Sequence, residues 1–204
     1  YPLRFLPEFK DLMIQLSKNP ILGIGIGTVL TMLVQASSAT ISILQSIYND
    51  GLVTLQAALP VLFGDNIGTT ITAVIAVIGS TTTAKRLAAA HVTFNVVGTV
   101  IFTILLVPFT MYVSTMERIL GMNPKTVIAF AHGSFNTLTT VLMFPFIGYL
   151  EFFVTKLIKE SKEELAQKVN PLDLTLIHTP VIALGQVKNE MGTMLSLALE
   201  NLKL

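Results

Sequence analysis

The chain has 204 residues, of which 52% are apolar and only 12% are charged, and its mean hydropathy is +0.71. Because soluble domains average roughly 25% charged residues, this composition predicts an integral membrane protein. A net charge of +1 gives no electrostatic reason to expect a nucleic-acid partner, and the absence of cysteine excludes disulfides and cysteine-based metal sites.

Residues 1–18 are rich in charged side chains, with apolar residues at helical spacing, and predict an amphipathic helix at the membrane interface. Asn19 followed by Pro20 is a helix start, with an N-cap residue and a first-turn proline. The apolar run that follows ends at Gln35, and residues 19–84 contain no Lys or Arg. This run is shorter than the ~20 residues that a spanning helix needs.

The polar sequence QASSAT at residues 35–40 separates this run from a second short apolar run, residues 41–48, which ends at the turn 49–51. Polar side chains at membrane depth need a functional reason, and non-helical backbone is tolerated there only where it lines a cavity. Two short helices joined by a polar tip therefore predict a re-entrant hairpin.

The next apolar stretch, residues 53–78, contains Pro60 and the sequence GDNIGTT at residues 64–70. We interpret GDNIGTT as a turn, which predicts one spanning helix broken near its middle. Its second half would then begin after Gly68, with free backbone N–H groups at membrane depth.

Two long segments, residues 87–112 and 126–153, can each span a bilayer with some tilt. They share an internal echo, because AHVTFN at 90–95 matches AHGSFN at 131–136. Since residues four apart share a helix face, the echo groups His91 with Asn95 and His132 with Asn136.

The sequence becomes strongly charged after this region and then amphipathic. We expect a membrane region at residues 19–158, a charged linker at 159–170 and the start of a soluble helical domain at 171–204. Lys85 and Arg86 would lie on the same side as the charged residues 156–168 if two helices separate them, and the positive-inside rule makes that side cytoplasmic. The loop with Glu117, Arg118 and Lys125 would then face outward.

The predicted helix starts suggest an ion-binding chemistry. Helix N-termini carry partial positive charge and unpaired donors, and they bind phosphate or sulfate without Lys or Arg. Near the first start, Ser37, Ser38 and Thr40 add hydroxyls and Gln35 adds an amide. Free carbonyls at the ends of half-helices suit Na⁺. Further oxygen ligands come from Asp65, Asn66, Thr69 and Thr70.

Structural alternatives stay open for each of these residues. Ser and Thr in membrane helices often bond their own backbone or a neighbouring helix. Asp65 could cap the following helix, and His91 and His132 could carry protons or make hydrogen bonds between helices. The sequence shows no paired carboxylates, Ser-His-Asp set or metal-ligand spacing, so we expect neither an enzyme nor a bound cofactor.

The combination of Q-x-S-S-A-T, G-x-N-I-G-T-T and A-x-x-H-x-x-F-N resembles the type II sodium–phosphate cotransporter family over about residues 19–150. That family's usual tip is Q-S-S-S, so Ala36 stands at the first serine position, and Asp65 replaces a small residue. The tail resembles the PhoU-like helical domain of bacterial members, through PLD at 171–173 and HTPVIAL at 178–184.

The resemblance implies an all-α transporter built from two inverted repeats that form one site between them. This chain has one tip motif and corresponds to the second repeat, so we expect it to be a portion of a longer protein. The first repeat would come from the same parent chain or from another chain, and a homodimer is a candidate assembly.

The resemblance also implies site residues. Phosphate would contact Gln35, Ser37 and Ser38, while sodium would contact Asn66, Thr69 and Thr70, with Thr40 and Asp65 as further candidates.

The expected activity is import of inorganic phosphate across the plasma membrane with Na⁺ as the coupling ion, by alternating access. The expected arrangement is a multi-pass protein whose tail is cytoplasmic. Two alternatives remain. One is a phosphate-sensing membrane protein with the PhoU-like tail as its output, and the other is a transporter of another small oxyanion.

Overall fold

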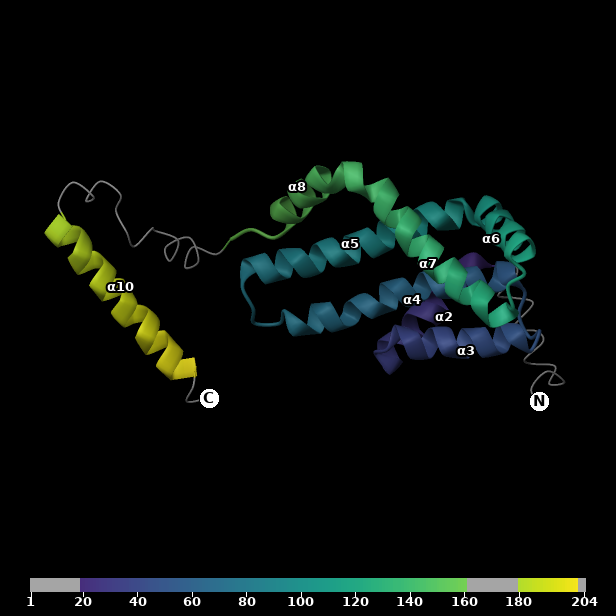
Figure 1. The fold of residues 1–204 in the computed structure, drawn as a ribbon, viewed down its shortest axis with the longest axis horizontal. Coiled ribbons are helices and arrows are strands. Elements are labelled where there is room, and N and C mark those ends of the chain that lie inside the picture. Colours follow the sequence, from purple (N-terminus) through teal and green to yellow (C-terminus); the bar gives the residue numbers. More distant parts are fainter. Residues whose placement is uncertain (1–18, 161–179, 202–204) are drawn as a thin grey trace. The chain divides into compact units, whose positions relative to one another are not determined.

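A computed structural model describes residues 19–160 and 180–201, and within these ranges every regular element is a helix (Figure 1). This confirms the predicted all-helical class. Contacts divide the chain after Ile158, and helix α10 (Pro180–Asn201) belongs to the second unit. The predicted interfacial helix at 1–18, most of the predicted linker and the tail sequence 171–179 lie outside the described residues.

The first two described helices form the predicted hairpin. Helix α2 (Pro20–Val34) starts at Asn19, whose side chain accepts hydrogen bonds from the N–H groups of Ile21 and Leu22. It ends at Gln35, which takes a left-handed conformation with φ 54°, and Ala36 is extended. Helix α3 (Ser37–Asn49) follows directly. The tip thus needs only two non-helical residues, and α2 is about 22 Å long at 1.5 Å per residue, shorter than the bilayer core.

Helix α4 (Leu55–Ala76) is continuous, so the predicted break at residues 64–70 is wrong. Pro60 lies inside the helix and leaves one carbonyl without a helical donor, yet the helix continues. Because residues 64–70 are helical, no free N–H groups follow Gly68. The glycines that suggested a turn serve instead to bring α4 against α2.

The contact between α2 and α4 is a reciprocal glycine interface. Gly23 and Gly27 are four residues apart on α2, and Gly64 and Gly68 are four apart on α4. A Cβ atom added to Gly27 would overlap the backbone of Val61, and one added to Gly64 would overlap the α2 backbone at Ile24 and Thr28. Small residues at this spacing let two helix backbones approach closely.

Both long segments predicted to be single helices are interrupted. The first consists of α5 (Thr82–Ile104) and α6 (Leu106–Leu120). The second consists of α7 (Pro124–Met143), the 3-10 turn η2 (Phe144–Phe146) and α8 (Ile147–Leu157). Each interruption lies within three residues of a proline, Pro108 or Pro145. A proline cannot donate to the carbonyl four residues earlier and its ring clashes with it, which explains both positions.

Within residues 19–160 and 180–201, three stretches are long and apolar enough to cross a membrane, namely Leu55–Ala76, Thr82–Ile104 and Pro124–Leu157. The guanidinium Nε of Arg86, at the start of α5, donates to the carbonyl of Ile158, just after α8, at 2.9 Å. The beginning of α5 and the end of α8 therefore lie on the same side, as predicted for Lys85–Arg86 and the charged residues that follow α8.

An aromatic cluster joins α4, α5, α6 and α7. Phe63 stacks on Phe135 with ring centroids 4.9 Å apart, and Phe102 contacts Phe135 at 5.1 Å and Phe109 at 4.9 Å. All four rings are buried. Phe63 is two residues from Asp65 and Phe135 is next to Asn136, so this apolar packing fixes the position of the polar residues beside it.

Candidate functional site

A pocket of about 330 Å³ lies where α3, α4, α5 and α7 meet. Its lining contains residues from three of the sequence motifs: Ser37, Asn66, Thr69, His91, Phe94, Asn95, His132 and Asn136. Among the residues that the structure describes, the lining includes no Lys, Arg, Asp or Glu. The fold thus brings the tip, the GDNIGTT sequence and both His–Asn pairs to one cavity rich in neutral hydrogen-bonding groups.

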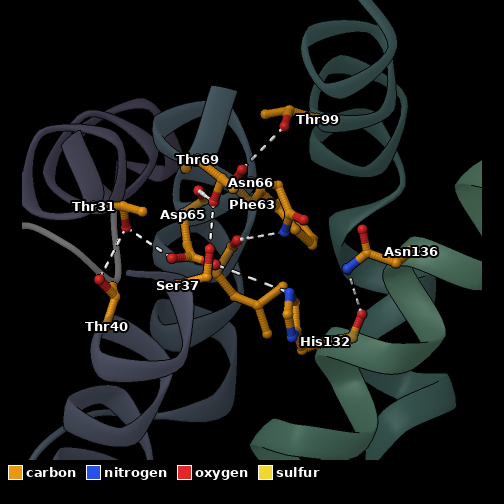
Figure 2. Close-up of polar contacts among 12 residues, drawn as sticks. Thr31, Ser37, Thr40, Phe63, Asp65, Asn66, Thr69, Thr99, His132 and Asn136 are labelled. Atoms are coloured by element: carbon orange, nitrogen blue, oxygen red, sulfur yellow. Dashed lines mark hydrogen bonds and ion pairs between the residues drawn. The ribbon is translucent and has the colours of Figure 1, made fainter. Parts of the chain in front are cut away.

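Ser37 is the first residue of α3, so the start of this helix lies at the pocket. Ala36 gives α3 no side-chain cap, and the Ala36 carbonyl accepts from the N–H groups of Ala39 and Thr40. The N–H groups of Ser37 and Ser38 therefore have no helical partner, as expected for a helix N-terminus. The Ser37 hydroxyl is hydrogen-bonded to the hydroxyl of Thr69 on α4 (Figure 2). This bond ties the tip to α4.

The carboxylate of Asp65 is fully buried between α2, α3 and α4. Its Oδ1 atom accepts a hydrogen bond of 2.7 Å from the Thr31 hydroxyl, and the hydroxyls of Thr31 and Thr40 are bonded at 3.0 Å. Because a hydroxyl has one proton and Thr31 gives its proton to Asp65, Thr40 is the donor in the bond between the threonines. Asp65 lies mid-helix, so the alternative that it caps a helix is wrong.

Thr31 is a candidate site residue that the sequence interpretation missed. It lies on α2, is fully buried and joins the two candidate cation ligands Thr40 and Asp65 (Figure 2). A signal was present, because Thr31 follows Gly23 and Gly27 at intervals of four residues. A polar residue in line with a glycine interface points at the neighbouring helix.

No described residue is hydrogen-bonded to the second oxygen of Asp65, although this oxygen is buried. The Nε2 atom of His132 on α7 lies 3.9 Å from it, beyond the usual hydrogen-bond range of about 2.7–3.2 Å. Figure 2 shows Asp65 between the two threonines on one side and His132 on the other. An unpaired buried carboxylate oxygen is costly, so this atom requires an explanation.

The remaining polar residues of α4 bond their own helix. Asn66 Nδ2 donates to the Leu62 carbonyl at 3.0 Å, Thr69 to the Asp65 carbonyl at 2.8 Å and Thr70 to the Ile67 carbonyl at 2.7 Å. These bonds match the structural alternative, but Asn66 and Thr69 also line the pocket. Thr70 does not.

The other predicted tip residues lie apart from the pocket lining. Gln35 and Ser38 are exposed, and Thr40 is buried against Thr31. Ser37 is therefore the predicted tip residue that belongs to the pocket lining.

The two His–Asn pairs have the same local geometry. Asn95 Nδ2 donates to the His91 carbonyl and Asn136 Nδ2 to the His132 carbonyl, both at 2.9 Å. Each bond fixes its asparagine amide on the pocket wall. Within residues 19–160, neither histidine ring makes the hydrogen bond to another helix that the alternative interpretation predicted. The surroundings of the two pairs differ, because His91 is exposed whereas His132 is half-buried and approaches Asp65.

This arrangement has two chemical capacities side by side. The pocket offers hydroxyl, amide and imidazole groups next to a helix N-terminus, which suits a small oxyanion. The wall behind it holds a carboxylate with an unpaired oxygen and two threonine hydroxyls, which suits a cation.

Comparison with known proteins connects this geometry to a family. Residues 5–131 match the family model described as Na+/Pi-cotransporter. The chain belongs to the Na+/Pi-cotransporter family. The resemblance read from the three motifs is thereby confirmed, and this family consists of membrane transporters.

Relatives of this Na+/Pi-cotransporter family member include both bacterial and animal proteins. "Uncharacterized protein YqeW" of Bacillus subtilis is 36% identical over 71% of this chain and 46% of its own length. Human "Sodium-dependent phosphate transport protein 2B" is 50% identical over 26% of this chain and 8% of its own length. "Putative inorganic phosphate export protein YjbB" of Salmonella typhimurium is 21% identical over 87% of this chain and 33% of its own length.

The chain thus spans less than half the length of each of these relatives. No solved structure matches the chain.

Proposed function

We propose that this chain forms one repeat of a sodium:phosphate symporter that imports inorganic phosphate across the plasma membrane by alternating access. The observation that carries the proposal is the pocket in which the uncapped start of α3 meets neutral donors from α4, α5 and α7, directly beside the buried Asp65. Family membership supports the same substrates.

Phosphate binds, in this proposal, at the Ser37 end of the pocket. The free N–H groups of Ser37 and Ser38 and the partial positive charge of the helix start stabilise the anion without a basic residue. The pocket volume of about 330 Å³ leaves room for a phosphate ion. Gln35 and Ser38 are exposed and would contact the anion from the open side of the tip.

Sodium binds beside Asp65, where its charge offsets that of the carboxylate. Na⁺ takes oxygen ligands, and Asp65, Thr31, Thr40 and Thr69 supply them within one cluster. Asn66 borders this cluster from the pocket. Thr70 was also predicted as a ligand, but its hydroxyl is bonded to the Ile67 carbonyl and is the weakest candidate.

The energy source would be the inward Na⁺ gradient together with the membrane potential, which supplies about 2.3 kcal/mol per charge per 100 mV. We place the end of α8 and the PhoU-like tail in the cytoplasm. The first repeat would come from the same parent chain or from another copy, and one repeat would move against the other during transport.

The decisive experiment is uptake of radiolabelled phosphate into proteoliposomes that contain the full-length protein, with an inward Na⁺ gradient compared with an equal K⁺ gradient. We expect accumulation only with Na⁺. Phosphate binding without accumulation would favour the sensor alternative. Inhibition of uptake by sulfate as strong as by unlabelled phosphate would favour a broader oxyanion transporter.

The direction of transport needs its own measurement, because one relative is named as a phosphate export protein. Vesicles preloaded with labelled phosphate should retain it under an inward Na⁺ gradient and release it when the gradient is reversed. Release under the inward gradient would contradict import.

Variants of α3 test the anion site within the same assay. Ser37→Ala removes the hydroxyl that lines the pocket, and we expect it to raise the KM for phosphate about tenfold, equivalent to about 1.4 kcal/mol. Ser42→Ala is the matched control, because Ser42 lies on the same helix, donates to the Ser38 carbonyl and does not line the pocket. Equal KM values for the two variants would contradict the assignment of Ser37.

A further inference from the structure

The two His–Asn pairs are similar enough to be compared with each other. His91 and His132 line the same pocket, begin the same A-H-x-x-F-N echo and hold their asparagines with the same 2.9 Å bond. They differ in exposure, because His91 is exposed and His132 is half-buried, and in the approach of His132 Nε2 to Asp65 Oδ2. Any function that requires this contact belongs to His132 and not to His91.

Among the described residues, no other side chain donates to Asp65 Oδ2. Thr31 on α2 gives its proton to Oδ1, and on α4 the Thr69 hydroxyl gives its proton to the Asp65 backbone carbonyl. On α3, Thr40 is turned to Thr31. His132 is thus the neighbouring side chain that can donate to Oδ2, after a movement of roughly 1 Å to reach hydrogen-bond distance.

His132 has a second place to donate, because 30% of its side-chain surface is exposed and it lines the pocket. Its Nε2 proton can point to Asp65 or to an anion in the pocket, but not to both. A group with two exclusive partners at two sites can carry coupling between those sites, provided that each ligand favours one arrangement.

We propose that His132 is the positioning residue through which a cation at Asp65 strengthens anion binding in the pocket, an inference that rests on the proposed function. With the cation site empty, His132 turns to Oδ2. A cation bound at Oδ2 repels the N–H group and takes its place, so the imidazole donates to the anion instead. Phosphate binding then favours Na⁺ binding by the same factor, because coupling between sites is reciprocal.

The test measures the apparent phosphate KM of the full-length protein in proteoliposomes over a series of Na⁺ concentrations. The ratio of KM values at low and saturating Na⁺ is the coupling factor. Couplings between sites are typically about 5–150-fold, and we expect the unmodified protein to fall in this range. His132→Leu, which has no donor, should reduce the factor to about 2-fold or less.

Two further variants show whether a loss of coupling comes from the missing N–H donor or from altered packing. His132→Gln places an amide N–H near the position of Nε2, and we expect it to restore most of the coupling factor. His91→Leu is the matched control. It removes a pocket donor from the equivalent position of the echo, so we expect a higher phosphate KM with the coupling factor unchanged.

The outcomes separate this inference from the proposed function. If the unmodified protein takes up phosphate with Na⁺ coupling and His132→Leu keeps its coupling factor, the role of His132 is wrong. An equal loss of coupling in His91→Leu would also overturn it. If the unmodified protein shows no Na⁺ effect on phosphate, the proposed function itself fails.

His132→Asn is a second variant in case His132→Leu does not assemble. Asparagine keeps a polar side chain, but its amide is too short to reach Asp65 Oδ2, so we expect the coupling to be lost. Retention of full coupling in His132→Asn would overturn the proposal.

Discussion

At the scale of single residues, the hydroxyl of Thr31 holds the one charged side chain buried in the described membrane helices. Thr31 is the hydrogen-bond donor to Asp65 Oδ1 at 2.7 Å, and both side chains are fully buried. Loss of that donor would leave both carboxylate oxygens without a partner among the described residues, since Oδ2 already lacks one there. The stability of the α2–α4 contact should therefore depend on this hydroxyl.

Thr31→Val keeps the shape of the side chain and removes the donor. We expect it to lower the free energy of unfolding by about 1–3 kcal/mol, the usual cost of an unsatisfied buried partner. The measurement is reversible unfolding in detergent micelles, followed by circular dichroism or steric trapping.

Thr28→Val is the control for this prediction. Thr28 lies one turn earlier on α2, is half-buried and donates to the Gly64 carbonyl, a neutral backbone group inside a helix. We expect a loss of about 1 kcal/mol or less there. Equal losses in the two variants would mean that the Asp65 contact carries no special stabilisation.

At the scale of elements, the interface between α2 and α4 depends on which glycines face the partner helix. Gly23, Gly27, Gly64 and Gly68 all lie where an added Cβ would collide with the other helix. Gly25 lies between two of them in sequence, but a Cβ there meets nothing within 4 Å. Gly25 therefore does not belong to the packing face, because neighbouring positions of a helix point to different sides.

Gly27→Ala should be much more damaging than Gly25→Ala. A Cβ at Gly27 would lie 3.1 Å from the Asp65 backbone nitrogen and closer still to the Val61 backbone. Rigid backbone cannot yield easily, so we expect a loss of about 1–3 kcal/mol. The helices would also separate and disturb the Thr31–Asp65 bond, so the Na⁺ requirement of uptake should rise.

Gly25→Ala should be neutral or stabilising by up to about 1 kcal/mol, because alanine is the better helix former. Both variants can be compared by thermal unfolding in the same detergent. A Gly27→Ala protein with unchanged stability and Na⁺ dependence would show that the close contact is not required.

At the scale of the whole molecule, the bond between Arg86 and the Ile158 carbonyl puts the α4–α5 connection and the end of α8 on one side. Which side of the membrane this is remains a prediction from the basic residues, namely the cytoplasmic side. The absence of cysteine makes it directly testable, because one introduced cysteine is the only thiol in these 204 residues.

Thr83→Cys and Thr126→Cys report the two sides. Both residues are exposed and lie in the first turns of α5 and α7, which are connected through α6. A membrane-impermeant maleimide applied to intact cells should label Thr126→Cys and not Thr83→Cys, and permeabilised cells should allow both to react. The reverse pattern would place the end of α8 outside and contradict the proposed orientation.

Local features of the sequence were sufficient for several elements. Asn19-Pro20 predicted the start of α2, the QASSAT tip predicted the hairpin, and the hydropathy predicted long membrane helices. Each depends on interactions within a few residues or on average polarity, which the sequence displays directly. The motifs also predicted Ser37, Asn66 and Thr69 as site residues, and the structure places these three at one pocket.

Other features depended on which residues of distant segments meet. GDNIGTT contains the residues of a turn, yet it is helical because its glycines fit against those of α2. Little in the sequence around Thr31 distinguishes it from other helix residues. Its importance comes from α4, which places Asp65 Oδ1 2.7 Å from the Thr31 hydroxyl. The A-H-x-x-F-N echo predicted two equivalent pairs, and only the packing of α7 beside α4 makes His132 different from His91.

The sequence by itself thus determined the membrane class, the hairpin and the chemical character of the candidate site, because these follow from local and average properties. The tertiary structure decided the continuity of α4 and the partners of Asp65, because both depend on contacts between residues more than thirty positions apart.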